Sequence, residues 1–144
     1  MVARCIFCRI VAGESQGHFV HRDDCCTAFL DVNPFNPGHT LIVPNLHVAR
    51  LSELPHETAA HLFITATRIA RAIIDSDLRS EGFNIFLSDG ECAGQEVLHT
   101  HLHVLPRFSG DGLRVDLGRD PSRVPSSELT AVASKIGKCV DRIA

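Results

Sequence analysis

Three histidines alternate with other residues in the segment His99-Thr100-His101-Leu102-His103. In a β-strand successive side chains point to opposite faces, so this spacing puts three imidazoles on one face, roughly 6.5–7 Å apart, and leaves a mostly apolar face to pack on a core. Imidazole is the side chain best suited to act as nucleophile, proton carrier or metal ligand near neutral pH. Three of them on one face predict a functional site rather than an ordinary exposed strand.

The composition is that of a globular protein. The chain has 144 residues, of which 44% are hydrophobic and 22% charged, which suits one domain with its own core. The formal net charge is −3, and no basic stripe is present that would bind a nucleic-acid polymer, although a few donors suffice for one phosphate. We find no apolar run long enough for a bilayer and no apolar signal region after residues 1–4, so we expect no membrane partner and a cytoplasmic location.

Apolar periodicity and turn signals predict an α+β domain with a largely antiparallel sheet. Runs bounded by Gly, Pro, Asn and Asp predict strands at 19–21, 26–32, 39–44, 83–88 and 99–105. Pro106 is expected to stop the last strand. Helical spacing predicts a short helix or turn over 5–12, a long helix over 55–76 and a final helix from Ser126. Cys139 lies on the apolar stripe of the final helix, where we expect it to be buried.

The turn before the histidines has the composition of an anion-binding loop. Gly94 lets the backbone approach a ligand closely, and successive N–H groups along Gln95, Glu96 and Val97 can form a nest for phosphate oxygens. A neutral imidazole beside such a nest can attack phosphorus and form a covalent intermediate, while the N–H donors stabilise the transition state. Taken alone, however, the segment is better explained as a simple turn between strands.

Two further polar residues precede the histidine segment. His39 opens a strand after the turn at 33–38 and would lie beside the histidines if the two strands are neighbours, although a surface histidine is the simpler interpretation. Asp31 follows Phe29 and Leu30 in an apolar strand, where a carboxylate needs a partner. A ribose diol would serve, and an arginine or a backbone N–H would serve equally well.

Cys5 and Cys8 form a Cys-x-x-Cys pair with the spacing of a metal site. The sequence has no second such pair, so the remaining ligands would be histidines, and His47 and His99 could face a common point. A reduced, metal-free thiol pair explains the sequence equally well. A thioredoxin-type redox pair is disfavoured because no strand precedes the motif.

Taken together, these segments resemble the histidine triad (HIT) superfamily. The signature His-x-His-x-His followed by apolar residues is met at 99–105, and the family's order and spacing are also met by Gly94-Gln95, Asp31–Pro34, Pro37-Gly38-His39 and Val43-Pro44. The resemblance covers residues 4–108. It implies a HIT-like α+β fold with a five-stranded, mainly antiparallel sheet, a long helix and a C-terminal helix. We expect a HIT domain over 1–108, and a loop plus C-terminal helix over 109–144 that extends the same domain.

The resemblance implies nucleotide-binding proteins that cut a bond at the α-phosphorus of a nucleoside phosphate derivative. His101 would be the nucleophile that forms a nucleotidyl-histidine, His103 and His39 would assist at the phosphate, and His99 would orient its neighbours. The nucleotide would be held by Ile6, Phe7, Ile10, Phe29, Asp31, Leu41, Ser88, Gln95, Glu96 and Val97. Within this set Asp31 would bind the ribose hydroxyls and the apolar members would line the base pocket.

The Cys-x-x-Cys pair is similar to that of zinc-carrying bacterial members and of the galactose-1-phosphate uridylyltransferase branch. This likeness implies a structural zinc ion on Cys5, Cys8, His47 and His99, with four protein ligands and no open position. The family also implies a homodimer, formed through the long helix and the fourth strand so that the two sheets become continuous.

Two positions depart from the family pattern. Ser88 stands where most members have Asn or Gln, and Glu96 stands where many members have Ser or Thr. A carboxylate beside a phosphate repels it unless the carboxylate is protonated or turned away. These departures leave open the rate of the implied reaction and its preferred leaving group. They do not affect the assignment of the nucleophile.

The sequence therefore predicts a hydrolase or transferase that acts on purine nucleoside phosphoramidates, adenylyl conjugates or dinucleoside polyphosphates, with no redox cofactor. A nucleotide-binding or scaffold protein with little turnover is the alternative that Ser88 and Glu96 favour. A third hypothesis is a metalloenzyme with an open zinc position at the histidines. It is disfavoured because no carboxylate ligand is expected near them.

Overall fold

The computed structural model describes residues 5–114, 124–140 and 143. The chain divides into two compact units, residues 1–113 and residues 114–144. This boundary lies five residues beyond the predicted one at 108, and the assignment of both parts to one domain stays a prediction. Among the helices of the described ranges, none combines the length and the apolar character needed to span a bilayer.

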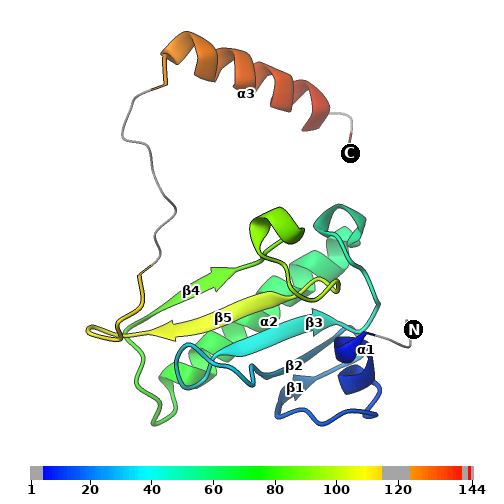
Figure 1. The fold of residues 1–144 in the computed structure, drawn as a ribbon, viewed down its shortest axis with the longest axis vertical. Helices are drawn as coiled ribbons and strands as arrows, with labels where there is room; N and C mark the ends of the chain where they lie inside the picture. Colours follow the sequence, from blue (N-terminus) through cyan, green and yellow to red (C-terminus); the bar gives the residue numbers. More distant parts are fainter. Residues whose placement is uncertain (1–4, 115–123, 141–142, 144) are drawn as a thin grey trace. The chain divides into compact units, whose positions relative to one another are not determined.

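A five-stranded antiparallel sheet forms the centre of the first unit (Figure 1). Its strands lie in the order β1 (Phe19–Arg22), β2 (Cys26–Leu30), β3 (Thr40–Pro44), β5 (Leu102–Arg107) and β4 (Gly82–Phe86). Every neighbouring pair is antiparallel. The unit also contains helices α1 (Ile6–Val11) and α2 (His56–Ile74), and short 3-10 helices at Leu51–Glu53 and Glu91–Ala93. The predicted α+β class with its antiparallel sheet is therefore confirmed.

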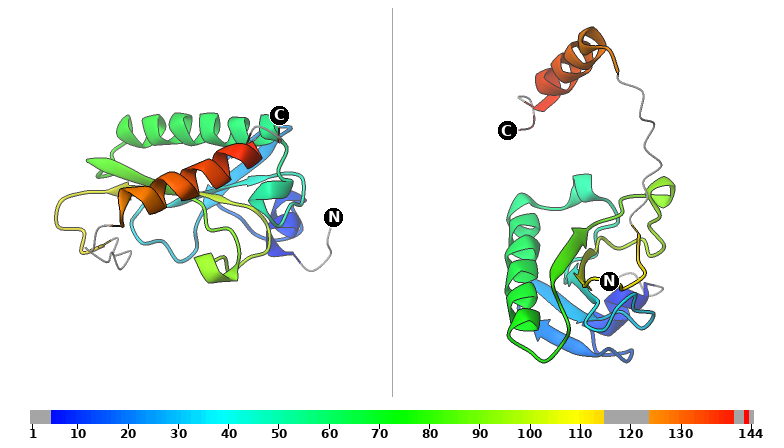
Figure 2. Two further views of the ribbon diagram at one scale, coloured as in Figure 1. Left: turned by 90° about the horizontal axis from the view of Figure 1, so that it is seen from above. Right: turned by 90° about the vertical axis from the view of Figure 1, so that its left-hand side faces the viewer.

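Side chains of the central strands alternate between two apolar cores. In α2, apolar residues recur every three or four positions, so they form one stripe that packs on one face of the sheet (Figure 2). This core contains Ala28, Ile42, Leu62, Ala66, Ile69, Ile73, Leu102 and Val104. The opposite face packs on α1 through Phe7, Ile10, Phe29, Leu41 and Val43. His103 alternates with Leu102 and Val104, so it lies on the α1 face.

β5 differs from the predicted strand at both ends. It begins at Leu102, so His99 precedes the strand and does not follow its alternation. It also runs through Pro106 to Arg107, and the predicted stop at Pro106 is therefore wrong. β3 pairs with β5 only as far as Val104, and beyond that point β4 alone among the described strands pairs with β5. A proline, which cannot donate to a ladder, is tolerated where a strand has an open side.

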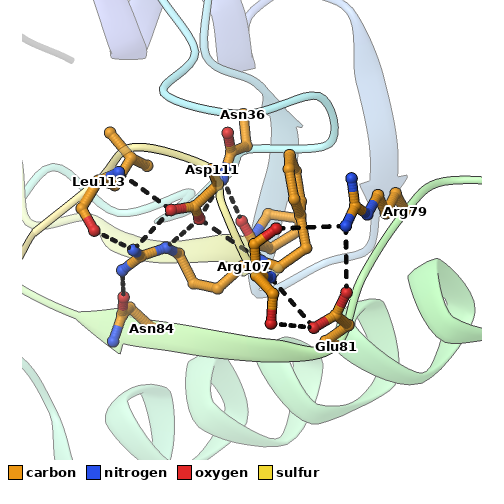
Figure 3. A network of polar contacts seen from close by, with 10 residues as sticks. Asn36, Arg79, Glu81, Asn84, Arg107, Asp111 and Leu113 are labelled. Atoms are coloured by element: carbon orange, nitrogen blue, oxygen red, sulfur yellow. Dashed lines mark hydrogen bonds and ion pairs between the residues drawn. The ribbon is translucent and has the colours of Figure 1, made fainter.

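A polar network fixes the turn that follows β5 (Figure 3). The Arg107 guanidinium donates to both carboxylate oxygens of Asp111, at 2.6 and 3.0 Å, and to the carbonyl of Leu113 at 2.6 Å. It also donates to the Asn84 side chain in β4. The buried Asn36 amide donates to Asp111 at 3.0 Å. The network therefore joins β5 to the turn at 33–38, which leads into β3.

The second unit contains α3 (Ser126–Val140), whose start confirms the prediction of a helix from Ser126. Its predicted apolar stripe is exposed within this unit, and so is Cys139. No residue that the structure describes in the second unit covers Cys139, so the expected burial is not found there. Most of the predicted loop at 109–125 lies outside the described residues, namely 115–123.

Candidate functional site

A pocket of about 750 Å³ opens on the α1 face of the sheet, a size typical of small-ligand sites. It is lined by all of the residues predicted to hold a nucleotide except Gln95, namely Ile6, Phe7, Ile10, Phe29, Asp31, Leu41, Ser88, Glu96 and Val97. The wall on the α1 side is apolar, while His101 and His103 supply imidazoles to the same space. The fold thus brings an apolar cradle and two histidines together.

Gln95 does not line this pocket. Its side chain is buried and accepts a hydrogen bond from the Gly90 N–H at 2.7 Å. Its amide group donates to the carbonyls of Ala49 and Val97, both at 3.0 Å. Gln95 therefore holds the loop at 90–97 in shape. Gly94 in this loop has φ +86°, a conformation that favours glycine, and it lines the pocket.

The hydrogen bonding of His101 fixes its tautomer. Nδ1 lies 2.7 Å from the carbonyl oxygen of His99, and because a carbonyl only accepts, Nδ1 carries the proton. In the neutral ring Nε2 is then the nitrogen with the free lone pair. The ring packs edge-on against Phe7, with centroids 5.2 Å apart. The backbone carbonyl of His99 therefore sets the orientation of the His101 ring.

His39 and His103 form a second imidazole pair. Nε2 of His39 lies 3.0 Å from Nδ1 of His103, and the Phe35 N–H donates to Nδ1 of His39 at 3.4 Å. His39 therefore donates from Nε2, which leaves His103 with its own proton on Nε2. Burial lowers the pKa of His39, and burial together with the nearby imidazoles of His101 and His39 lowers the pKa of His103 to about 4. Both rings are neutral at pH 7.

Asp31 lies at the rim of this pair. One carboxylate oxygen accepts from the Asn33 N–H at 2.9 Å, and the other lies 3.6 Å from Nδ1 of His39, beyond hydrogen-bond distance. Ligand atoms of Asp31, His39 and His103 lie within 4.8 Å of one another. The expectation that no carboxylate lies near the histidines is therefore wrong, although His101 does not belong to this group.

Two aromatic rings of the site were missed by the sequence analysis. Phe86 stacks on His103, with ring centroids 4.3 Å apart and planes 7° apart. Phe35 stacks on His39 at 5.5 Å. Both rings line the pocket. The position of Phe86 opposite His103 depends on the β4–β5 register, which the sequence does not reveal, whereas an aromatic residue in the Pro-rich turn was a signal for Phe35.

The side chain of His99 belongs to a different cluster. Its Nδ1 lies 3.4 Å from Cys5 Sγ and 3.3 Å from His47 Nδ1, which in turn lies 3.2 Å from Cys8 Sγ. The four ligand atoms all lie within 4.8 Å of one another. The three histidines of the signature therefore do not form one row, because His99 turns toward the cysteines while His101 and His103 line the pocket.

The donor set fits a tetrahedral zinc ion. Nε2 of His99 donates to the Pro44 carbonyl at 2.9 Å, so Nδ1 presents its lone pair to the thiols. Burial lowers the pKa of His99, which keeps the ring neutral, as a metal ligand must be. With two sulfur and two nitrogen donors and no vacant position, such an ion would be structural. It would tie α1 to the backbone that positions His101.

Comparison with known proteins places the chain in a family. The adenylylsulfatase HINT3 of Arabidopsis thaliana is 37% identical over 138 residues, 96% of this chain and 68% of that protein. A solved HIT family protein from Bacillus anthracis has 34% identity and a TM-score of 0.87, covering 96% of this chain and 99% of the other. A zinc-bound histidine triad family protein from Mycobacterium smegmatis has 39% identity and a TM-score of 0.74, covering 94% and 97%.

These likenesses confirm the expected HIT-like fold. A family model described as the HIT domain matches residues 12–110, which is more than half of the chain and includes the sheet, α2 and the histidine segment. The chain belongs to the HIT domain family.

Proposed function

We propose that this protein is a nucleotide hydrolase or transferase that cleaves at the α-phosphorus of a purine nucleoside phosphoramidate, an adenylyl conjugate or a dinucleoside polyphosphate. The observation that carries the proposal is the 2.7 Å bond from Nδ1 of His101 to the His99 carbonyl. When the ring is neutral, this bond leaves Nε2 as its basic nitrogen, in a pocket of about 750 Å³. An imidazole held in one tautomer is prepared for nucleophilic attack.

In the proposed first step Nε2 of His101 attacks the α-phosphorus in line, the bond from phosphorus to the leaving group breaks, and the leaving group takes a proton from solvent. Attack puts positive charge on the ring, and the His99 carbonyl stabilises that charge through the Nδ1–H bond. In the second step water attacks the nucleotidyl-histidine, releases the nucleoside monophosphate and restores the neutral ring. No redox cofactor is needed.

The neighbouring groups serve binding. His103 is neutral, and its Nε2–H is a donor for a phosphate or leaving-group oxygen. Asp31 retains an oxygen without a hydrogen bond from His39, which suits the two hydroxyls of a ribose. N–H groups of the Gly94–Val97 loop would bind phosphate oxygens. Ile6, Phe7 and Leu41 line the apolar wall, where a base would pack.

We further propose a structural zinc ion on Cys5, Cys8, His47 and His99. Zinc with these ligands would supply no reactive position and would hold the His99 segment in place. The fit of the donor set and the zinc-bound relative from Mycobacterium smegmatis support this assignment.

A homodimer is proposed through α2 and β4. β4 is an edge strand, whose unpaired backbone groups favour pairing with another strand. Phe63 and Ile64 of α2 are each 56% exposed, and large exposed apolar side chains mark interfaces. Sedimentation of the wild type and of Phe63→Glu tests this. The wild type should sediment as a dimer and the variant as a monomer.

The alternative of nucleotide binding with little turnover is favoured by Ser88 and Glu96, because both line the pocket. The serine side chain has a short reach, and the carboxylate repels phosphate. This alternative predicts micromolar AMP binding with negligible product from any substrate.

A substrate panel tests the proposal. It contains adenosine phosphoramidate, adenylyl sulfate, adenylyl-lysine and diadenosine tetraphosphate, with wild type, His101→Asn and the control His18→Asn, which replaces an exposed histidine. At least one substrate should be hydrolysed by wild type and control, and His101→Asn should lower kcat by at least about 1000-fold while AMP binding persists. Retained turnover in His101→Asn would refute the assignment. Binding without turnover in the wild type would favour the alternative.

A further inference from the structure

A second cluster of metal-binding side chains lies where the turn between β1 and β2 meets α2. Nε2 of His21 and Nε2 of His61 each lie 2.8 Å from the same oxygen, Oδ2 of Asp23. Cys26 Sγ lies 3.9 Å from that oxygen, and the ligand atoms of His21, Asp23 and Cys26 are all within 4.8 Å of one another. None of these residues lines the pocket or belongs to the Cys5 cluster.

The carboxylate of Asp23 is held in one orientation by its other oxygen. Oδ1 accepts from the N–H groups of Cys25 and Cys26, both at 2.8 Å. The Asn45 amide donates to the Asp23 carbonyl at 2.8 Å and anchors the turn itself. Oδ2 is therefore directed at the two histidines, as in metal sites whose ligands are oriented by a surrounding layer of hydrogen bonds.

We propose that His21, Asp23 and Cys26 bind a divalent first-row transition ion, such as Zn²⁺ or Co²⁺, with His61 of α2 drawn in as the fourth ligand. Nitrogen and sulfur donors select such ions over Mg²⁺ and Ca²⁺, which prefer oxygen. Ligand atoms about 2.0–2.2 Å from a tetrahedral ion lie roughly 3.3 Å apart. Nε2 of His21, now 2.8 Å from Oδ2, would therefore move by about half an ångström. His61 would move further, because its ligand atom is outside the group that lies within 4.8 Å.

The Asp23 carboxyl is ionised, and the cluster is open to solvent on one side. Burial raises the pKa of the Asp23 carboxyl, but hydrogen bonds from His21, the Cys26 amide and His61 outweigh it and hold the pKa well below the usual range. The side chains of His21 and Asp23 are 27% exposed and that of His61 36% exposed, whereas Cys26 is fully buried. An ion can enter from solvent and meet the thiol on the inner side.

Binding exchanges protons for the ion. Each imidazole must carry its proton on Nδ1, so that both Nε2 lone pairs face the metal, and the two N–H···O bonds to Asp23 are replaced by metal bonds. The thiol of Cys26 releases its proton to solvent when it ligates. The ion would then clamp the β1–β2 hairpin to α2.

Cobalt binding to the full-length chain tests the site. Wild type, His21→Ala and the control His56→Ala, an exposed histidine at the start of α2, are titrated with Co²⁺ by absorption spectroscopy, and the bound metal is counted. His21→Ala should lose one equivalent, or bind it at least about tenfold more weakly, whereas the control should match wild type. The lost equivalent should carry the charge-transfer band of a thiolate–cobalt bond. Other metal sites add the same absorption and the same number of bound ions in all three proteins.

A further variant separates a metal site from a hydrogen-bonded contact. His21→Gln keeps an N–H donor for Asp23 but lacks the ring nitrogen. It should unfold at the wild-type temperature without added metal, and its cobalt-dependent rise should be smaller than that of wild type, since only the Cys5 cluster still binds metal. If His21→Ala and His21→Gln both bind as many equivalents as wild type, with the same affinity and thermal shift, the cluster is a hydrogen-bonded clasp only and the proposal is wrong.

Discussion

Replacing Cys8 by serine should release the proposed structural zinc and destabilise the first unit. Cys8 is only 4% exposed, and its thiol lies 3.2 Å from His47 and 3.6 Å from His99. A serine hydroxyl is a poor zinc ligand, and the three remaining donors do not complete a tetrahedral site. The link from α1 to residues 47 and 99, which are distant in sequence, would be lost.

The size of the effect follows from binding linkage. A ligand present at 100 times its Kd stabilises the folded state by about 2.7 kcal/mol. For a unit of roughly 110 residues, 1 kcal/mol corresponds to about 4 °C in Tm. Removal of zinc should therefore lower the Tm by about 10 °C, whether a chelator or the substitution removes it.

Thermal unfolding with zinc and with a chelator measures this. All proteins carry His21→Ala, so that the second cluster does not contribute. The parent should lose about 10 °C on chelation, and so should Cys92→Ser, which replaces an exposed cysteine. Cys8→Ser should unfold at the lower temperature under both conditions. The reasoning fails if the chelator leaves the Tm of the parent unchanged, or if zinc still raises the Tm of Cys8→Ser.

Three further predictions concern the core and the pocket. The pKa of His103 is about 4 in the folded state and about 6.5 in the unfolded chain. Between these pH values the His103 ring is protonated only in the unfolded chain, so the free energy of unfolding falls as the pH drops from about 6.5 to about 4. His103→Asn should flatten the fall by up to about 1.4 kcal/mol per pH unit in denaturant titrations, and an unchanged slope would contradict the assignment. Gly38→Ala should cost at least about 1 kcal/mol in the same assay, since Gly38 has φ +89° and an added Cβ would lie 3.1 Å from Leu78. Gly82→Ala is the control, because an added Cβ there would have nothing within 4 Å. Equal losses of unfolding free energy in the two variants would contradict the proposed strain at Gly38. Phe7→Leu should weaken AMP binding by several-fold with the protein folded, measured by calorimetry, because Phe7 forms the pocket wall; unchanged affinity would place the base elsewhere.

Much of the fold was predictable because local pattern and packing agree. The nearly continuous apolar runs in β2 and β3 predict strands that are covered on both faces, and both faces are buried. The apolar spacing of α2 predicts its stripe. The ends of β5 were not predictable, because they depend on where β3 stops pairing. That stop allows Pro106 to lie within a strand, contrary to the local rule.

The candidate site was predictable in composition but not in connectivity. Alternation alone put His99 beside His101, whereas His99 precedes β5 and turns to the cysteines. Its carbonyl, which no side-chain pattern reveals, orients His101. The cluster at Asp23 was also not predicted from the sequence. His61 lies 38 residues away and contacts Asp23 only because α2 packs on the sheet.

Trapping of the covalent intermediate tests the central claim most directly. The protein is mixed with adenosine phosphoramidate for less than one turnover and quenched in alkali, and its peptides are examined by mass spectrometry. We expect one AMP group on the peptide that contains the histidine segment, located at His101 and missing from His101→Asn. Product formation with no adduct, or an adduct on His103 or another residue, would contradict nucleophilic attack by His101.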